Sequence, residues 1–263
     1  MSGNGTVGKA LDVLDQVAAY GRPVRFATVL ADSSYPKATL YRLLQTLTQE
    51  NLLDYDPQTQ TYSLGVRLIR LAHSAWTQSS LAPIARPHLD RLSAAVQHTV
   101  HLAQLDHAQV LYVDKRNARQ RVEMFSDAGK VGPAYCTGVG KAMMAFLPKD
   151  RQDQVIAQQS FHRFTANTLA TASDLRADLR EVGQRGYALD REEHEQGIIC
   201  IAYPILTQSG QMLGALSITG TIQTITLAQL ESLAPQLART AAAIAADAQD
   251  WRFPEMTMQQ TGT

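Results

Sequence analysis

The chain has 263 residues, of which 45% are hydrophobic and 18% are charged. This length suits two domains, and this composition excludes a disordered chain, a collagen-like chain and a small disulfide-rich protein. The 24 basic residues balance the 24 acidic ones, so no net charge attracts the chain to nucleic acid or to an anionic membrane. Two cysteines are too few for a disulfide framework and suit a reducing compartment.

Neither membrane insertion nor secretion is expected. The most apolar run, residues 197–206, is far shorter than the ~20 residues that span a bilayer. Residues 1–5 lack the basic and apolar regions of a secretion signal. We therefore expect a cytoplasmic protein with no membrane partner.

A winged helix-turn-helix domain is predicted over residues 5–65. Apolar residues recur at helical spacing over 6–19, over 26–31 and from Pro36 to about Asn51. Two serines before the third helix are candidate caps, and the proline that opens it suits a first helical position. Its buried stripe would consist of Leu40, Leu43, Leu44 and Leu47. Two short strands joined by a turn follow, over 52–55 and 61–64.

The third helix has a polar outer face that suits DNA. From Ser34 to Gln49 the sequence holds two basic residues and no acidic one. Arg, Gln and Thr side chains on the second helix of a helix-turn-helix read base edges in the major groove. Serines and free N–H groups at a helix start bind phosphates. The candidate DNA-binding residues are Ser33, Ser34, Lys37, Thr39, Tyr41, Arg42 and Gln45.

A protein-binding role for this domain stays open at this point. Residues 1–65 carry five basic and six acidic residues, whereas a lone DNA-binding module has a basic footprint. Many winged helices bind other proteins, and polar residues on an outer face are usually just solvated. A dimer with two recognition helices would need less positive charge from each copy.

The rest of the chain predicts a linker and an α+β domain. Residues 66–79 form a linker helix with an apolar stripe that includes Trp76, and we expect it to carry dimerisation. A helix over 81–96 follows, which Pro83 and Pro87 would kink or interrupt. Residues 80–250 form the second domain, in which strands from Thr99, around Val110, over 198–206 and over 212–219 build an antiparallel sheet. The helices around it would cover 137–146, 150–159, 173–185 and 226–246, the last opened by a capping box. Residues 251–263 are expected to be a disordered tail.

No motif in the second domain predicts catalysis. Residues 138–141 resemble a phosphate-binding loop. No glycine lies five positions before Gly140, however, and Ala142 stands where such a loop has Ser or Thr. No Gly-x-Ser-x-Gly sequence is present. His98 and His101 would point to opposite faces of a strand, so a shared metal is not expected. We expect no enzyme activity, no cofactor and no metal.

Small and polar residues gather where a helix start would meet the sheet. The helix start contributes Thr137, Gly138 and Val139, whose backbone N–H groups attract a carboxylate. Successive strands contribute Asp190, Cys200, Ser217 and Thr219, the last two on one face. A purely structural role stays open, with Cys200 in the core and both hydroxyls bonded to backbone.

Five segments resemble those of one known family. They are SYPKATLYRLL at 34–44, YSLG at 62–65, TGVGKA at 137–142, GYALDREE at 186–193 and GIICIAYP at 197–204. In this order over two domains they resemble the IclR (isocitrate lyase regulator) family of bacterial transcriptional regulators, from about Gly5 to Asp247.

The resemblance implies a linker helix used in dimerisation and a GAF-like domain that binds a small metabolite, commonly a carboxylate. The ligand would lie at Gly138, Val139, Asp190, Cys200, Ser217 and Thr219, with Cys136 and Thr137 beside them. The family often has an apolar residue and a histidine before this helix, where this chain has Ala134, Tyr135 and Cys136. We expect Tyr135 and Cys136 to reshape the pocket.

These features together predict a ligand-responsive, DNA-binding transcriptional regulator, a repressor rather than an activator. Its partners would be a pseudo-palindromic double-stranded operator, a small organic acid and further copies of itself in a homodimer or tetramer. The acid would shift the balance between DNA-competent and DNA-incompetent arrangements. The alternative is a metabolite-processing enzyme whose winged helix serves only for dimerisation. The recognition face lacks the apolar patch that such a dimer would need.

Overall fold

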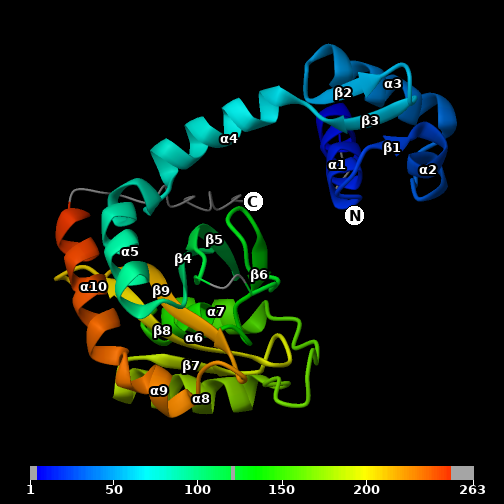
Figure 1. Cartoon of the computed structure of the whole chain (residues 1–263). Helices are drawn as coiled ribbons and strands as arrows, with labels where there is room; N and C mark the ends of the chain where they lie inside the picture. The colour runs from blue at the N-terminus through cyan, green and yellow to red at the C-terminus, as the bar shows by residue number, and fades with distance from the viewer. Residues whose placement is uncertain (1–4, 120–121, 250–263) are drawn as a thin grey trace. The chain divides into compact units, whose positions relative to one another are not determined.

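The computed structural model describes residues 5–119 and 122–249, and it divides the chain into two compact units (Figure 1). The first unit ends at Gln78 and the second begins at Ser79. In the described part of the chain, no helix is long and apolar enough to cross a bilayer. The tail predicted over 251–263 lies outside the described residues.

The first unit is a winged helix-turn-helix followed by a long helix. Its helices are α1 (Thr6–Ala19), α2 (Phe26–Ala31), α3 (Lys37–Gln49) and α4 (Val66–Ser79). Its strands are β1 (Val24–Arg25), β2 (Leu53–Asp56) and β3 (Thr61–Leu64), all paired antiparallel in the order β1-β3-β2. The sequence did not predict β1, because two residues are too few to show a strand period.

The predicted leucine stripe of α3 forms the centre of this unit's core. Leu40 and Leu44 have no solvent exposure, and they pack with Val13 and Val17 of α1. Burying one such side chain stabilises the fold by roughly 1.5–3 kcal/mol. The opposite face of α3 is thereby turned to solvent.

The start of α3 differs from the prediction. Pro36 is the residue before the helix rather than its first residue, and no side chain caps α3. The Ser33 hydroxyl instead accepts a hydrogen bond from the N–H of Tyr35 at 3.2 Å, and Ser34 is exposed. The capping prediction was wrong because a local turn competes for the serine hydroxyl.

The second unit is α+β with one antiparallel sheet, as predicted. The strands are β4 (Thr99–Asp106), β5 (Gln109–Arg116), β6 (Val131–Pro133), β7 (Ala188–Arg191), β8 (Ile198–Leu206) and β9 (Met212–Thr221). Their order within the described residues is β6-β5-β4-β9-β8-β7. The last strand in sequence therefore lies near the centre, where it joins the β4–β5 and β7–β8 pairs.

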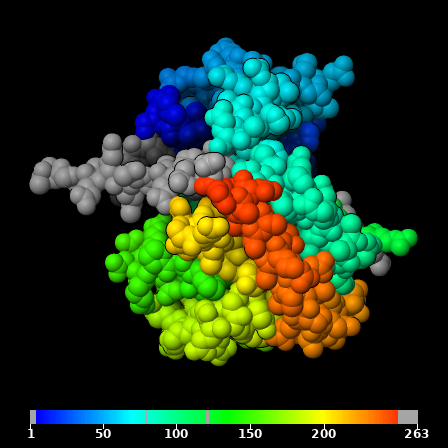
Figure 2. Space-filling model, turned by 90° about the vertical axis from the view of Figure 1, so that its left-hand side faces the viewer, coloured from blue at the N-terminus to red at the C-terminus, as the bar shows by residue number. Residues whose placement is uncertain are grey.

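Helices cover both faces of this sheet. One face carries α5 (Ala82–Val96), α9 (Leu227–Ser232) and α10 (Ala234–Asp247), and Figure 2 shows the red-orange α10 running beside α5. The other face carries α6 (Gly138–Ala145), against which α7 (Lys149–Ala157) and α8 (Ala172–Arg185) pack in turn.

Two predicted helices differ from the structure. α5 continues unbroken through Pro87, with Pro83 in its first turn. The capping box at Thr226 and Gln229 is present. The helix it opens, however, ends early, and α10 starts anew after Leu233 because Pro235 cannot donate a backbone N–H.

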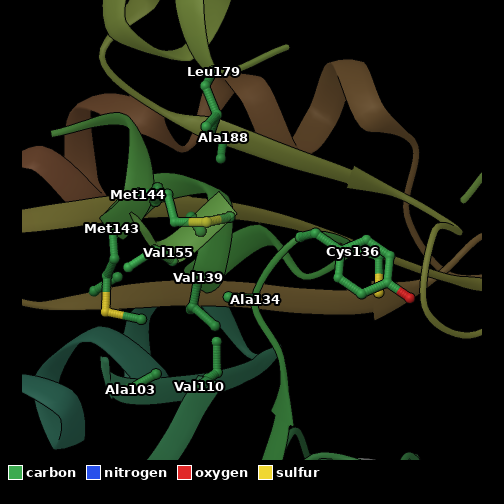
Figure 3. Packing of buried hydrophobic residues seen from close by; sticks show 14 of the residues in the cluster. Ala103, Val110, Ala134, Cys136, Val139, Met143, Met144, Val155, Leu179 and Ala188 are labelled. Carbon is green, nitrogen blue, oxygen red and sulfur yellow. The ribbon is translucent and has the colours of Figure 1, made fainter. Parts of the chain in front are cut away.

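Close packing fixes α6 against the sheet. Val139, Met143 and Met144 of α6 pack among Val110 and other buried residues (Figure 3). The sheet presents small side chains to this helix, namely Ala103, Ala188, Ala202 and Ala215. The start of α6 is thus held at one place above β8 and β9.

Candidate effector and DNA-binding sites

A buried polar cavity lies in the second unit between the start of α6 and the sheet. Its volume is about 30 Å³, which is room for about one or two water molecules. Seven of the eight predicted effector-binding residues line it: Thr137, Gly138, Val139, Asp190, Cys200, Ser217 and Thr219. The eighth, Cys136, is fully buried in the neighbouring apolar core and does not line the cavity.

Strand register explains how these residues meet. Cys200 on β8 pairs with Asp190 on β7 and with Thr219 on β9. Ser217 lies two residues from Thr219 and therefore on the same face. His101 on β4 is the pairing partner of Ser217. Four adjacent strands thus place polar side chains under the start of α6.

The start of α6 presents uncapped backbone N–H groups to this cavity. The Thr137 hydroxyl donates to the carbonyl of Pro133 at 2.8 Å, and no side chain caps the helix. Backbone N–H groups at a helix start carry a partial positive charge that favours a carboxylate. Gly138 and Val139, which supply these groups, both line the cavity.

His101 is a central residue of the site that the sequence analysis missed. Its Nδ1 lies 3.3 Å from both Ser217 Oγ and Thr219 Oγ1, and its Nε2 lies 3.0 Å from Ser126 Oγ. Burial, together with the charge of Lys115, lowers the pKa of His101 to about 3. The ring is therefore neutral at pH 7, with one donor and one acceptor nitrogen.

The sequence offered a weak signal for His101. The prediction treated it only as a potential metal ligand with His98, which the structure places before β4 rather than on it. Within the described residues, no three His, Cys, Asp or Glu side chains converge as a metal site. The cross-strand pair with Ser217 is what identifies His101, and pairing of distant strands is not visible in sequence spacing.

Five further residues line the cavity. Tyr112 lies on β5 and Ile198 on β8, whereas Ser126, His194 and Glu195 lie outside helices and strands. The His194 ring packs edge-on against Phe125 and Phe164 at centroid distances of 5.0 and 4.8 Å, and burial lowers its pKa. No arginine or lysine belongs to the described lining.

Asp190 is a buried carboxyl that takes up a proton near neutral pH. Its Oδ1 accepts a hydrogen bond from the N–H of Glu193 at 2.8 Å. Burial first, and then the charge of Glu193, raise the pKa of Asp190 to about 7. Close to pH 7 the carboxyl is therefore about half protonated, and in the protonated form it can donate a hydrogen bond.

Tyr135 and Cys136 were expected to reshape the pocket, but neither lines the cavity. Tyr135 is fully buried, and its hydroxyl donates to the carbonyl of His162 at 2.5 Å. Its ring packs against Phe161. Both residues belong to the apolar packing beside the cavity.

The first unit exposes the predicted recognition face of α3. Lys37, Tyr41, Arg42 and Gln45 are exposed, and Gln45 Nε2 donates to the Tyr41 hydroxyl at 2.9 Å. Of the other candidates, Ser34 is exposed, whereas Ser33 and Thr39 are half-buried.

A groove of about 850 Å³ runs between α3 and the β2–β3 hairpin. Its described lining has two basic residues, Arg25 and Lys37, and three tyrosines, but no acidic residue. Arg25 and the hairpin residues Tyr55 and Gln60 were not predicted to lie here, because their position beside α3 depends on strand pairing.

Comparisons with known proteins assign both units. Residues 6–57 match the IclR helix-turn-helix domain, and residues 73–246 match the C-terminal domain of the bacterial transcriptional regulator IclR. The HTH-type transcriptional regulator KdgR of Dickeya chrysanthemi is 31% identical over 183 residues, which are 70% of this chain and 60% of that protein.

Two further matches cover a larger share of the related protein. The transcriptional repressor IclR of Escherichia coli is 26% identical over 220 residues, 83% of this chain and 80% of that protein. The crystal structure of the Thermotoga maritima IclR superposes with a TM-score of 0.76 at 26% identity, over 92% of this chain and 97% of that one.

These relatives are regulators, which confirms the prediction of a transcriptional regulator and not an enzyme. Both family models match in order, one on each unit. The chain belongs to the IclR family of bacterial transcriptional regulators, and it is a ligand-responsive, DNA-binding regulator of transcription.

Proposed function

We propose that the protein is a repressor whose effector, a small hydroxy or keto acid, binds in the cavity at the start of α6. One observation carries this proposal: the helix start at Gly138 and Val139, which no side chain caps, lines the same buried cavity as the hydrogen-bonded side chains of His101, Ser217 and Thr219. The carboxylate would accept from the N–H groups. The hydroxyl or keto oxygen would bond to Ser217 and Thr219.

Asp190 fits this ligand class in its protonated form. An ionised carboxylate beside an anionic ligand would repel it. Because the pKa of Asp190 is raised to about 7, a proton is available at little cost near neutral pH. Glu193 occupies Oδ1, so Oδ2 is the oxygen that would carry the proton and donate to the ligand.

Binding of such an acid would widen the cavity, since even a three-carbon acid is larger than the space for about one or two waters. The lining also includes Ser126, bonded to His101, and His194, whose ring packs edge-on against Phe125. We expect these two residues to move on binding, and their movement would bias the protein between two arrangements.

The first unit would bind the operator with the exposed face of α3. Arg42, Tyr41 and Gln45 would read base edges, and Lys37, Ser33, Ser34 and Thr39 would contact phosphates or flank them. Arg25 adds a positive charge to the adjoining groove. A relative that is a repressor supports repression as the direction of control.

A second copy of the chain is the partner we propose for α4. Val66, Ile69 and Leu71 on this helix are 59%, 70% and 53% exposed, and Val7 and Leu11 on α1 are exposed as well. Large apolar side chains left exposed in this number are characteristic of a surface that another protein covers. A dimer would present two α3 helices to the half-sites of a pseudo-palindrome.

The effector site is tested by calorimetry with acetate, glycolate, lactate, glycerate and pyruvate. We expect a hydroxy or keto acid to bind best, and Ser217→Ala to weaken that acid by ~1–3 kcal/mol because a buried partner is lost. Ser209→Ala is the matched control, since Ser209 is exposed in the β8–β9 turn. Equal affinities of the parent and Ser217→Ala for the best acid would place the effector elsewhere.

A further inference from the structure

Lys141 is a lysine without solvent exposure, one turn into α6. Its Nζ donates to both carboxylate oxygens of Glu193, at 2.6 and 2.7 Å, and lies 3.0 Å from Asp178 Oδ2. Burial alone would lower the pKa of Lys141, but the charges of Glu193 and Asp178 outweigh it and raise this pKa. The lysine is therefore charged inside the core.

Glu193 connects this lysine to the effector cavity. The side chain of Glu193 is held by Lys141, and its carbonyl accepts from the Thr168 hydroxyl at 2.6 Å. Its N–H donates to Asp190 Oδ1. The Asp190 carboxyl is thus held by a residue that is itself fixed at both its side chain and its backbone.

The ion pair also joins two walls of the cavity. One wall is the start of α6, with Gly138 and Val139. The other is β7 with the segment that follows it, and it contributes Asp190 on β7 and then His194 and Glu195. Lys141 and Glu193 belong to these same two segments. Any displacement of one wall relative to the other would have to stretch or break this pair.

Stability is a weak explanation for such a pair. Taking two charges out of water costs several kcal/mol per ion, and well-packed apolar residues in their place are often as stable or more so. The distinct consequence of a buried, fully bonded ion pair is a defined position for what it holds. Here it holds a residue of the effector cavity.

We propose that Lys141 is a positioning residue of the effector site, which acts through Glu193 to fix the Asp190 carboxyl beside the start of α6 and to set how readily that carboxyl takes up a proton. The role of this cavity as an effector site rests on the proposed function, whereas the action of Lys141 on Asp190 does not.

The other groups near Asp190 do not obscure the effect of Lys141 on its titration. Glu195 on the same segment adds a negative charge that raises the pKa of Asp190 further. His101 on β4 stays neutral, and burial raises the pKa of Tyr112, Cys136 and Cys200 well above neutrality. Lys141 lowers the pKa of Asp190, whereas the charge of Glu193 raises it.

The test is an NMR titration of the side-chain ¹³C signal of Asp190 in the ligand-free full-length protein, assigned with Asp190→Asn. We expect Lys141→Met to raise the titration midpoint, because a nearby positive charge is lost and Glu193 is no longer held where its N–H donates to the Asp190 carboxylate. Glu193→Gln, which keeps the shape of the side chain, should lower it. Lys149→Met on α7 is the control, since the Lys149 side chain is 70% exposed, and should leave the midpoint unchanged.

Opposite shifts in the two variants support the proposal, whereas a merely structural role predicts lower stability with an unchanged midpoint. An Asp190 midpoint in Lys141→Met that stays at the parental value or falls overturns it. Lys141→Gln, which also removes the positive charge but keeps a polar group, decides in the same way if Lys141→Met does not fold. Opposite shifts combined with no binding of any acid from the panel would leave this inference intact and reject the proposed effector.

Discussion

A Cβ atom added to Gly138 would lie 2.4 Å from the Sγ atom of Cys200. Real Cβ atoms essentially never come within 3.0 Å of a heavy atom of a residue elsewhere in the chain, so the start of α6 lies as close to β8 as a glycine allows. Cys200 is buried and paired on both sides in the sheet, which leaves its sulfur little room to move. This approach brings the first N–H groups of α6 to the polar residues of β8 and β9.

Gly138→Ala is therefore expected to destabilise the protein by about 1–3 kcal/mol through overpacking. Adding Cys200→Ala should recover most of that loss, because the sulfur is the atom that the new methyl group meets. Gly183→Ala is the control: a Cβ there meets nothing within 4 Å, and stability should rise by ~0.4–1 kcal/mol. Urea unfolding measures all of these variants, and simple additivity of Gly138→Ala and Cys200→Ala would contradict the contact.

Effector affinity should fall as the pH rises above neutrality. Burial and the charge of Glu193 raise the pKa of Asp190 to about 7, so the carboxyl is neutral below this pH and repels an anionic acid above it. The affinity should be constant near pH 6 and drop by up to about tenfold per unit well above pH 7, since binding takes up one proton. Calorimetry from pH 6 to 8.5 measures this slope. Asp190→Asn should remove it, and an unchanged slope in that variant would assign the proton to another group.

The same carboxyl makes folding depend on pH. Its pKa is raised above the unfolded value, so the folded state binds more protons between these two pKa values. The contribution of Asp190 to stability is thus complete below about pH 4 and is lost as the pH rises through about 7.

Arg42 and Lys37 should contribute differently to operator binding. Arg42→Ala is expected to cost ~1–3 kcal/mol on the operator and to relax discrimination at one base pair, because its side chain would contact a base edge. Lys37→Ala should weaken all sequences alike and reduce the salt slope by about 1, because it would contact a phosphate. Fluorescence anisotropy on operator and random DNA distinguishes the two, with the exposed Arg180→Ala of α8 as control. Parental binding by both variants would exclude α3 as the recognition helix.

Ile69→Glu should convert the proposed dimer to a monomer. Ile69 is 70% exposed on α4, and a buried, unpaired charge at an interface strongly disfavours association. Ile222→Glu is the matched control in the second unit, where the isoleucine is 52% exposed. Sedimentation velocity measures both variants. Dimer loss in Ile222→Glu alone would move the interface away from α4.

The sequence was sufficient to predict structure that depends on a single segment of the chain. The leucine stripe of α3 and the glycine-rich start of α6 show their structure in local spacing, and both lie where they were predicted. Strand alternation predicted only that Ser217 and Thr219 share one face. Their meeting with Asp190 and Cys200 in one site was what the family resemblance implied, and these four residues line one cavity.

What the sequence missed depends on partners far along the chain. His101 enters the cavity because β4 pairs with β9, more than a hundred residues later, and Ser126 and His194 enter from segments without regular structure. The Thr137 and Ser33 hydroxyls bond to backbone elsewhere rather than to their helices, which residue preferences do not reveal. Cys136 was assigned to the pocket by proximity in sequence, yet it belongs to the apolar core next to it.

We propose that an acid in this cavity controls DNA binding. This control is tested most directly by titrating the best-binding acid of the panel into the complex of the protein with its labelled operator. The operator is the sequence that the parent protein selects from random DNA. For the parent we predict operator affinity to weaken ~5–150-fold at saturation, the usual range of coupling between two sites. Ser217→Ala should bind the operator like the parent without acid but need about tenfold more acid for half of the release. Release of the operator from Ser217→Ala at the parental acid concentration would contradict the account, as would an operator affinity of the parent that no acid changes.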